Sequence, residues 1–407
     1  MQDAPARRSH SDETPGSTMD IDEAPPAAGG GTMAPTSTGS TVPSSMPSTT
    51  GKSYASGNTG TTESARHCSE DRSSTESASA SELPSNMTAP KLGSAGGNLP
   101  KGSSLPMYFG VAESNGRRNY MQDRHLLIED FQPSKEADLK ERCPEVRSLL
   151  GVFDGHKRSE PAETAARRLP ELLSREKAIF GPAKQTSSDE VFAAIKRTFQ
   201  TLDDEILKEA TSCDIADCQF GGSTAVIALR IGHVMYIAHC GDSGAVMACT
   251  SYDLHFPLRL TTDHKPNRAD EHARIQAANG NIDEKHNRVV SEPKPHNGRV
   301  TLLSMSRCLG DPQFKENDKD VVDCTPEMRR VELQPGDFAI VLASDGLWDV
   351  LSDTEVVTIL QKVRDQQEAI DGKTPKLGAE ALVQQSLRKG TADNVTAVVL
   401  MINWPES

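Results

Sequence analysis

Four aspartates stand where short apolar runs of the sequence begin or end. Asp154, Asp242 and Asp345 come at the end of runs with the length and composition of buried strands, and Asp393 comes just before the last such run. A carboxylate at the rim of a buried strand is unfavourable unless an opposite charge pairs with it. If these strands are neighbours, the four carboxylates would repel one another and be pushed toward protonation.

A bound cation would remove this repulsion. Carboxylates, backbone carbonyls and water are ligands that suit Mg²⁺ and Mn²⁺. Two such ions about 3.5–4 Å apart would share a carboxylate, lower the pKa of a bound water and clamp a phosphoryl group. An Asp-Gly pair after a strand is also typical of an ordinary turn. The residues alone therefore leave two interpretations open, a site for hard cations and a set of separate turns.

The elements around these aspartates predict an α+β fold. Five runs rich in β-branched, leucine and aromatic residues indicate strands, at 149–153, 223–229, 233–239, 338–343 and 395–402. Apolar spacing of three and four residues predicts helices at 161–179, 191–210, 269–278, 353–367 and 379–387. Ser187 with Glu190, and Ser352 with Glu355, have the spacing of capping boxes. The helices come in pairs, which favours antiparallel sheets flanked by helices over a doubly wound parallel sheet.

Composition divides the chain in two. Residues 1–104 are mostly Ser, Thr, Gly, Pro and Ala, and such a segment buries too little apolar surface to offset the entropy of ordering, so we expect a disordered extension. Residues 105–407 are globular in composition and suffice for one large domain. Within it, the polar segment 286–299, with Pro293 and Pro295, is expected to be a loop or flap over a surface site.

Bulk properties exclude several classes of protein. The net charge of −14 argues against nucleic-acid binding, which needs a basic face. The eight cysteines form no CxxC pair or zinc spacing, which favours reduced thiols. No apolar run approaches the ~20 residues of a membrane span, and the N-terminus lacks a secretory core. We expect an intracellular protein of the cytoplasm, the nucleus or both, and a monomer.

The globular part resembles the protein phosphatase 2C family of metal-dependent Ser/Thr phosphatases. The match runs from about Tyr108 to Asn403, and eight motifs occur in the family's order. These motifs are 116–124, 152–156, 221–225, 240–243, 263–266, 305–311, 343–349 and 391–395. The resemblance implies a sandwich of two antiparallel sheets between pairs of helices (α-β-β-α), with a flap near the active site. It also implies hydrolysis of phosphoserine and phosphothreonine on proteins by direct attack of a metal-bridging water.

The resemblance further implies roles for individual residues. Asp154 would bridge two Mg²⁺ or Mn²⁺ ions, with a carbonyl ligand from Gly155, and Asp345 and Asp393 would complete one metal's protein ligands. Asp242 occupies the position that, with Asp345, holds a weaker third ion in relatives. The remaining implied site residues are two metal ligands, Gln122 and Asp123, and two catalytic residues, Arg118 and His156.

The two catalytic residues would act on the phosphoryl group. Arg118 matches the family's phosphate-binding arginine, whose planar fork suits phosphate oxygens. His156 matches the general acid that protonates the departing seryl or threonyl oxygen. The expected partners are phosphoprotein substrates.

Several positions depart from the family's usual pattern. Gln122 stands where many relatives have Glu, so its metal position has one charge fewer and a lower expected affinity. Lys157 and Arg158 replace a common Gly-Gly pair and are either solvated or a positive rim that attracts phosphorylated substrates. Gly244 replaces a frequent Arg, which predicts a local packing change. The segment 286–299 lacks the Trp of the plant hormone-receptor-binding branch, and Trp348 is expected in the core.

Two other functions compete with an active phosphatase. A pseudophosphatase would bind phosphoproteins without turnover, but such proteins usually lose metal aspartates and this chain keeps all four. An aspartyl-phosphate enzyme needs an Asp-x-Asp motif, and Asp154 is followed by Gly155 and His156, which excludes that mechanism. The extension 1–104 offers many Ser and Thr residues for phosphorylation and is otherwise expected to be a flexible appendage.

Overall fold

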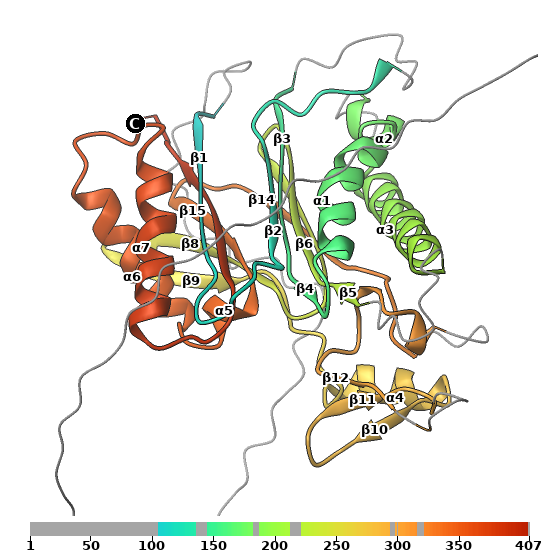
Figure 1. The fold of residues 1–407 in the computed structure, drawn as a ribbon. Coiled ribbons are helices and arrows are strands. Elements are labelled where there is room, and N and C mark those ends of the chain that lie inside the picture. The colour runs from blue at the N-terminus through green and yellow to red at the C-terminus, as the bar shows by residue number, and fades with distance from the viewer. Residues whose placement is uncertain are drawn as a thin grey trace, which may run out of the picture. The chain divides into compact units, whose positions relative to one another are not determined.

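Two five-stranded antiparallel sheets lie face to face at the centre of the molecule (Figure 1). The computed structural model describes residues 105–135, 145–181, 187–211, 221–293, 298, 300–315 and 321–405. The expected disordered extension 1–104 lies outside the described residues. One sheet has the order β1 (Met107–Ser114), β16 (Val395–Ile402), β15 (Asp337–Ala343), β8 (Gly244–Ser251) and β9 (Leu254–Arg259). The other has the order β14 (Glu327–Glu332), β7 (Val234–Cys240), β6 (Ala225–Ile231), β3 (Arg147–Phe153) and β2 (Arg124–Ile128).

Helices cover the outer face of each sheet. α1 (Glu160–Leu173), α2 (Lys177–Phe180) and α3 (Ser188–Thr211) pack on the sheet that contains β3, whereas α6 (Asp353–Asp365) and α7 (Thr374–Arg388) pack on the sheet that contains β16. The short α5 (Asp345–Trp348) follows β15 directly. This α-β-β-α arrangement confirms the predicted fold class. None of the helices in the described ranges has the length and apolar character that a bilayer crossing requires.

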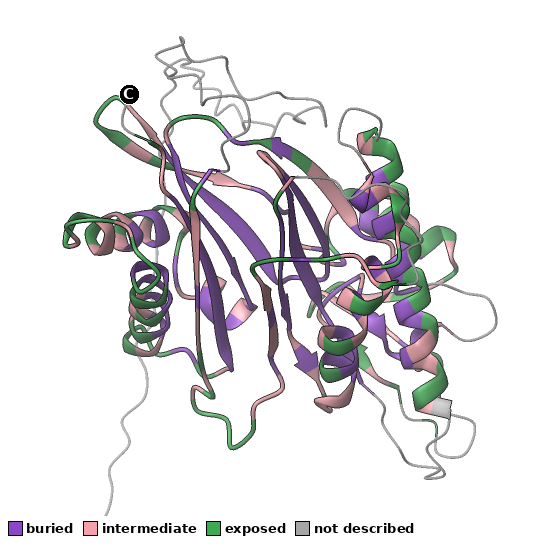
Figure 2. Cartoon of the chain, turned by 90° about the horizontal axis from the view of Figure 1, so that it is seen from above, coloured by how far each residue is buried: buried purple, intermediate pink, exposed green. Residues whose placement is uncertain are grey.

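The central strands are mostly apolar, and both of their faces are buried. In β3, Leu149 and Phe153 pack against the helices, whereas Leu150 and Val152 pack against the opposite sheet. Alternation of side chains along a strand produces this division. Figure 2 shows the same pattern, with buried strands at the centre and exposed residues along the outer faces of the helices. Three buried clusters, one between the sheets and one under each helical layer, hold the four layers together.

The starts of α3 and α6 follow the predicted capping boxes, whereas α7 begins at Thr374, five residues before the predicted start. Ser352 caps α6 with the predicted capping box, and Ser187 and Glu190 exchange the same reciprocal bonds before α3. The single helix predicted at 161–179 is wrong, because the structure has two helices there. α1 ends at Ser174, whose hydroxyl bonds the Glu171 carbonyl, and Glu176 takes an extended backbone before α2 begins.

A small three-stranded sheet and one helix form the flap. It contains α4 (Ala269–Ala277), β10 (Asn281–Asp283), β11 (Arg288–Val290) and β12 (Leu302–Leu303). The predicted loop at 286–299 is therefore partly a strand, because Val289 is buried in the flap's own apolar cluster and pairs with both neighbours. Residues 294–297 and 299 of that segment lie outside the described residues. A second short sheet, β13 (Leu309–Gly310), β5 (Gly222–Ser223) and β4 (Gly155–His156), lies beside the ends of the central strands.

Candidate active site

Strand register brings the predicted aspartates to one edge of the sandwich. Arg124 of β2 pairs with Phe153 of β3, so Asp123 and Asp154 lie next to each other at these strand ends. In the other sheet, Ala343 of β15 pairs with both Gly244 and Ala397. Asp345 follows the end of β15, Asp242 precedes the start of β8 and Asp393 precedes the start of β16. These three residues therefore lie at the same edge of that sheet. Asp242 itself lies on the connection that leaves β7 in one sheet and enters β8 in the other.

The five carboxylates lie close enough to perturb one another. Burial, reinforced by the charges of Asp123, Asp345, Asp242 and Asp393, raises the pKa of Asp154 well above its ordinary value. Burial also raises the pKa of Asp345 to about 8, and the charges of Asp242, Asp349 and Asp393 add to the shift. Burial raises the pKa of Asp123 to about 6, although a hydrogen bond from Ser344 opposes the shift. Burial is the largest cause of all three shifts, and repulsion between the carboxylates adds to it.

Two of these carboxylates have one oxygen satisfied and one oxygen without a partner. Oδ2 of Asp123 accepts a bond of 2.7 Å from the Ser344 hydroxyl, and Oδ2 of Asp242 accepts from the Lys265 ammonium. Oδ1 of each is buried without a hydrogen-bond partner among the described residues. Buried carboxylate oxygens without a hydrogen-bond partner are the donors that a hard divalent cation satisfies. The residues present therefore fit the metal that the sequence predicts.

Gly155 allows two backbone segments of the site to approach closely. A Cβ at this position would lie 2.8 Å from the carbonyl oxygen of Gln122 and 3.1 Å from the Cβ of Ala162. The Gln122 segment is fixed from its other side, because the Gln122 N–H donates to Oδ1 of Asn394 at 2.8 Å. The predicted ligands Gln122, Asp123, Asp154 and Gly155 are thus side by side.

Replacing Gly155 with alanine is expected to weaken metal binding at least 10-fold, because the added methyl group pushes the Gln122 carbonyl away. Titration of Mn²⁺ against activity measures the effect, and thermal unfolding reports whether the fold survives. Gly372→Ala is the control, because no heavy atom of the described residues lies within 4 Å of its added Cβ. Equal Mn²⁺ dependence of both variants would contradict the proposed role of this close approach.

Arg118 reaches the carboxylate cluster from the loop before β2. Its guanidinium contacts Oδ2 of Asp393 at 2.8 Å and the hydroxyl of Tyr120 at 3.0 Å. The group remains exposed, and the Asp154 charge is among those that act on it. An exposed planar guanidinium beside a cation site can bind two oxygens of a phosphate.

His156 is held by Asp311, a contact that the sequence analysis missed. Nε2 of His156 lies within hydrogen-bond distance of Oδ2 of Asp311, and Lys157 contacts Oδ1 of the same carboxylate at 3.1 Å. Although burial opposes ionisation, these two neighbours hold the pKa of Asp311 well below its usual range. A carboxylate paired with one ring nitrogen fixes the orientation of a histidine. Lys157 is therefore neither simply solvated nor part of a positive rim, whereas Arg158 binds Glu160.

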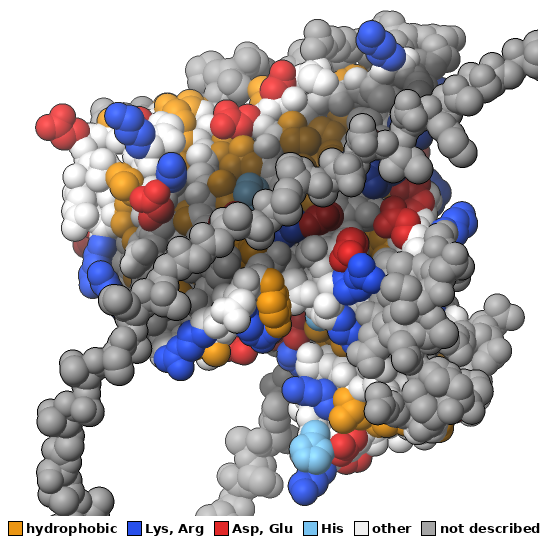
Figure 3. Space-filling view, viewed as in Figure 1, with side chains coloured by type: hydrophobic (Ala, Val, Ile, Leu, Met, Phe, Trp, Pro, Cys, Tyr) orange, Lys and Arg blue, Asp and Glu red, His pale blue; other side chains and the backbone are white. Residues whose placement is uncertain are grey.

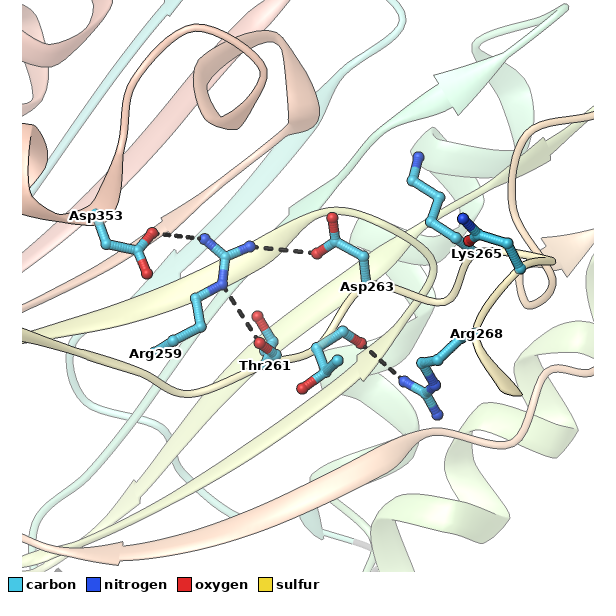
Figure 4. A pocket seen from close by; sticks show the side chains of 8 residues that line it. Arg259, Thr261, Asp263, Lys265, Arg268 and Asp353 are labelled. Carbon is cyan, nitrogen blue, oxygen red and sulfur yellow. Dashed lines mark hydrogen bonds and ion pairs between the residues drawn. The ribbon is translucent and has the colours of Figure 1, made fainter. Parts of the chain in front are cut away.

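A groove of about 500 Å³ opens next to the Asp242–Lys265 pair (Figure 4). Its lining includes Arg259, which contacts Asp353 at 3.0 Å and Asp263 at 3.2 Å. The Arg259 guanidinium also lies 4.5 Å from the centre of the Trp348 ring. It fills the space over Gly244, where a Cβ would lie 2.5 Å from its terminal nitrogen, so a larger residue at that position would displace the Arg259 side chain.

Charges of both signs surround the site. On the face in Figure 3, acidic and basic side chains are interspersed.

Trp348 is half-buried, and its indole N–H donates to the Ala343 carbonyl at 2.9 Å, which agrees with the expected core position.

Other members of the site were missed although their motifs were noticed. Lys265, Asp349 and Asp311 all lie in motifs that the sequence analysis singled out, but no role was assigned to them. For Asp349 a signal existed, since it caps the end of α5 four residues after Asp345, and residues at this spacing lie on the same side of a helix. No spacing rule could have found the contact of Asp311 with His156, because 155 positions separate them.

A sequence model of the family described as "Protein phosphatase 2C" matches residues 107–395. The chain therefore belongs to the protein phosphatase 2C family, and its enzyme class is that of a protein phosphatase. The resemblance stated from the sequence is confirmed.

Relatives and solved structures agree with this assignment. The human "Integrin-linked kinase-associated serine/threonine phosphatase 2C" is 32% identical over 310 residues, which cover 72% of this chain and 71% of that protein. "Probable protein phosphatase 2C 24" of Arabidopsis thaliana is 30% identical, covering 73% and 79%. A serine-threonine phosphatase 2C from Toxoplasma gondii aligns with a TM-score of 0.58 and 22% identity, over 74% of this chain and 96% of that one. This last likeness concerns the fold alone.

Proposed function

We propose that the protein is a metal-dependent serine/threonine phosphatase that hydrolyses phosphoserine and phosphothreonine on proteins. The observation that carries the proposal is the group of five aspartates at one edge of the sandwich, with Arg118 beside it; burial and neighbouring charges raise the pKa of Asp123, Asp154 and Asp345. A pseudophosphatase would not need to keep so many buried carboxylates, because each opposes folding when no cation is bound.

We assign the carboxylates as ligands of Mg²⁺ or Mn²⁺ ions. Asp154 would be a shared ligand of the ions, since the charges of the other four aspartates all act on it. Asp345, Asp393, Asp123 and the Gly155 carbonyl would be the further protein ligands, with Gln122 beside them. Asp242, already paired with Lys265, would help to hold a weaker third ion together with Asp345. When bound, the ions supply Lewis acidity that activates water and neutralises phosphate charge.

Arg118 and His156 are assigned to phosphate binding and to protonation of the leaving group. The Arg118 guanidinium binds the phosphate oxygens and orients the phosphorus toward the metal cluster. His156, oriented by Asp311, donates a proton to the departing alkoxide of serine or threonine. The groove beside Lys265 offers charged and hydroxyl groups to the residues that flank the phosphoserine.

A direct assay tests the function. Incubation of residues 1–407 with a phosphoserine peptide and millimolar Mn²⁺ is expected to release phosphate, and removal of the metal with EDTA is expected to stop the release. Tight binding of the peptide without turnover would instead establish the pseudophosphatase. The same assay on residues 105–407 tests whether the predicted domain boundary contains everything that catalysis needs.

Replacing His156 with glutamine is expected to lower kcat for a phosphoserine peptide by about 10²-fold or more. The same change should alter kcat for an aryl phosphate far less, because a phenolate leaves without a proton. Steady-state kinetics on both substrates measures the difference. His286→Gln, an exposed flap histidine paired with Asp283, is the control. An equal loss on both substrates would contradict the general-acid role.

A further inference from the structure

A second group of metal-binding side chains lies next to the aspartate cluster. Nε2 of His156, Sγ of Cys308 and a carboxylate oxygen of Asp311 all lie within 4.8 Å of one another. Sγ of Cys308 contacts Oδ2 of Asp311 at 3.1 Å, and Nε2 of His156 contacts the same oxygen. The three donors therefore converge on one point from three places in the sequence.

The donor set has a chemistry of its own. The aspartate cluster offers only oxygen ligands, which suit hard cations, whereas a thiolate and an imidazole select softer ions such as Zn²⁺. In a tetrahedral zinc site the metal–ligand bonds are about 2.0–2.3 Å, which places the donors roughly 3.5 Å apart. The described separations need only small side-chain movements to reach that spacing.

The surroundings of the three donors favour a metal site with three protein ligands and one coordination position open to solvent. The other oxygen of Asp311, Oδ1, accepts bonds from Lys157 at 3.1 Å and from Gln313 at 2.5 Å, so the carboxylate is already oriented. Cys308 and Asp311 are fully buried, whereas His156 is about one-fifth exposed and gives solvent access. Three protein ligands with access from one side leave a fourth position for water.

We propose that His156, Cys308 and Asp311 form an inhibitory site for Zn²⁺, distinct from the activating aspartate site. Binding releases the Cys308 proton to solvent, because a coordinated thiol is deprotonated. It also occupies the ring nitrogen by which Asp311 orients His156. The coordination itself is independent of the proposed function, and only its inhibitory consequence rests on the general-acid role of His156.

Spectroscopy tests the site without any substrate. With excess Mg²⁺ present to occupy the aspartate site, addition of Co²⁺ to the full chain is expected to produce a near-ultraviolet thiolate-to-metal absorption band that Zn²⁺ abolishes. Cys308→Ser should lose the band and bind Zn²⁺ at least 10-fold more weakly in competition with a chromophoric chelator. Seven other cysteines remain in that variant, so loss of the band assigns it to Cys308.

The controls separate coordination from folding and from catalysis. Cys249→Ser removes a buried thiol of β8 and is expected to keep the band. His156→Gln provides a second test at a more exposed position and should weaken Zn²⁺ binding as well. A wild-type chain without the band, or a band unchanged in Cys308→Ser, would overturn the proposal. A chain that shows the band but no phosphatase activity would contradict only the proposed function.

Discussion

Replacing Asp154 with asparagine is expected to remove phosphatase activity and, in the metal-free protein, to increase the free energy of unfolding. Activity should fall about 10³-fold or more, because a ligand of the proposed metal site no longer carries a charge. Stability should rise by about 1–2 kcal/mol in EDTA, because burial and four neighbouring carboxylates oppose ionisation of Asp154. The two effects have opposite signs, and a purely structural aspartate would not produce both.

Urea unfolding in EDTA and in Mn²⁺, together with the peptide assay, measures this variant. Asp337→Asn is the matched control, since Asp337 is buried, has a raised pKa and accepts from the Gln334 N–H at 2.8 Å, but begins β15 at the far end from Asp345. Its effect on unfolding should be the same with and without Mn²⁺. If Asp154→Asn also changes stability equally in both conditions, Asp154 does not hold a metal.

The metal-free protein is expected to lose stability as the pH rises from about 4 to about 8. In the folded state the pKa of Asp123 is about 6 and that of Asp345 about 8, whereas an unfolded aspartate has a pKa of about 3.9. The folded protein therefore binds more protons than the unfolded chain over this window. The stabilisation is complete below the unfolded pKa and is lost as the pH rises through the folded values. Each group contributes a slope of up to about 1.4 kcal/mol per pH unit.

Saturating Mn²⁺ should abolish or reverse this trend, because the metal replaces the protons and binds more tightly as they leave. Unfolding midpoints in urea between pH 5 and pH 9, with EDTA or Mn²⁺, measure the effect. Burial lowers the pKa of His239 and His264, which adds a pH dependence of its own. That contribution is the same in both conditions, so the difference between the two curves isolates the carboxylates. Parallel curves would contradict the metal assignment.

The sequence predicted the parts of the site that local patterns encode. Apolar runs buried on both faces identified β3, β15 and β16, and the aspartates at their ends were visible because a charge there breaks the pattern. The convergence of these aspartates was not visible, since it depends on strand order and register across two sheets. The family resemblance supplied that information.

Other features of the molecule depend on contacts that spacing cannot reveal. Asp311 meets His156, and Lys265 meets Asp242, only after the strands have assembled. The end of α1 was missed because residues 161–179 keep a helical periodicity while Glu176 takes an extended backbone. The strand β11 was missed because its three residues lie in a polar, proline-containing segment, and its single buried valine became meaningful only with β10 and β12 beside it.

The pairing of β1 with β16 has a consequence for how the enzyme becomes active during synthesis. β16 is the last strand described, yet it lies in its sheet between β1, the first, and β15. Asp393 stands two residues before β16, and Asp123 stands immediately before β2, so the carboxylates come from both extremes of the domain. Pairings between such distant segments form late, since closing a long loop is entropically unfavourable. On the proposed assignment of the metal ligands, a ribosome-bound chain that has not yet released β16 would lack a complete metal site and would be inactive until the domain is finished.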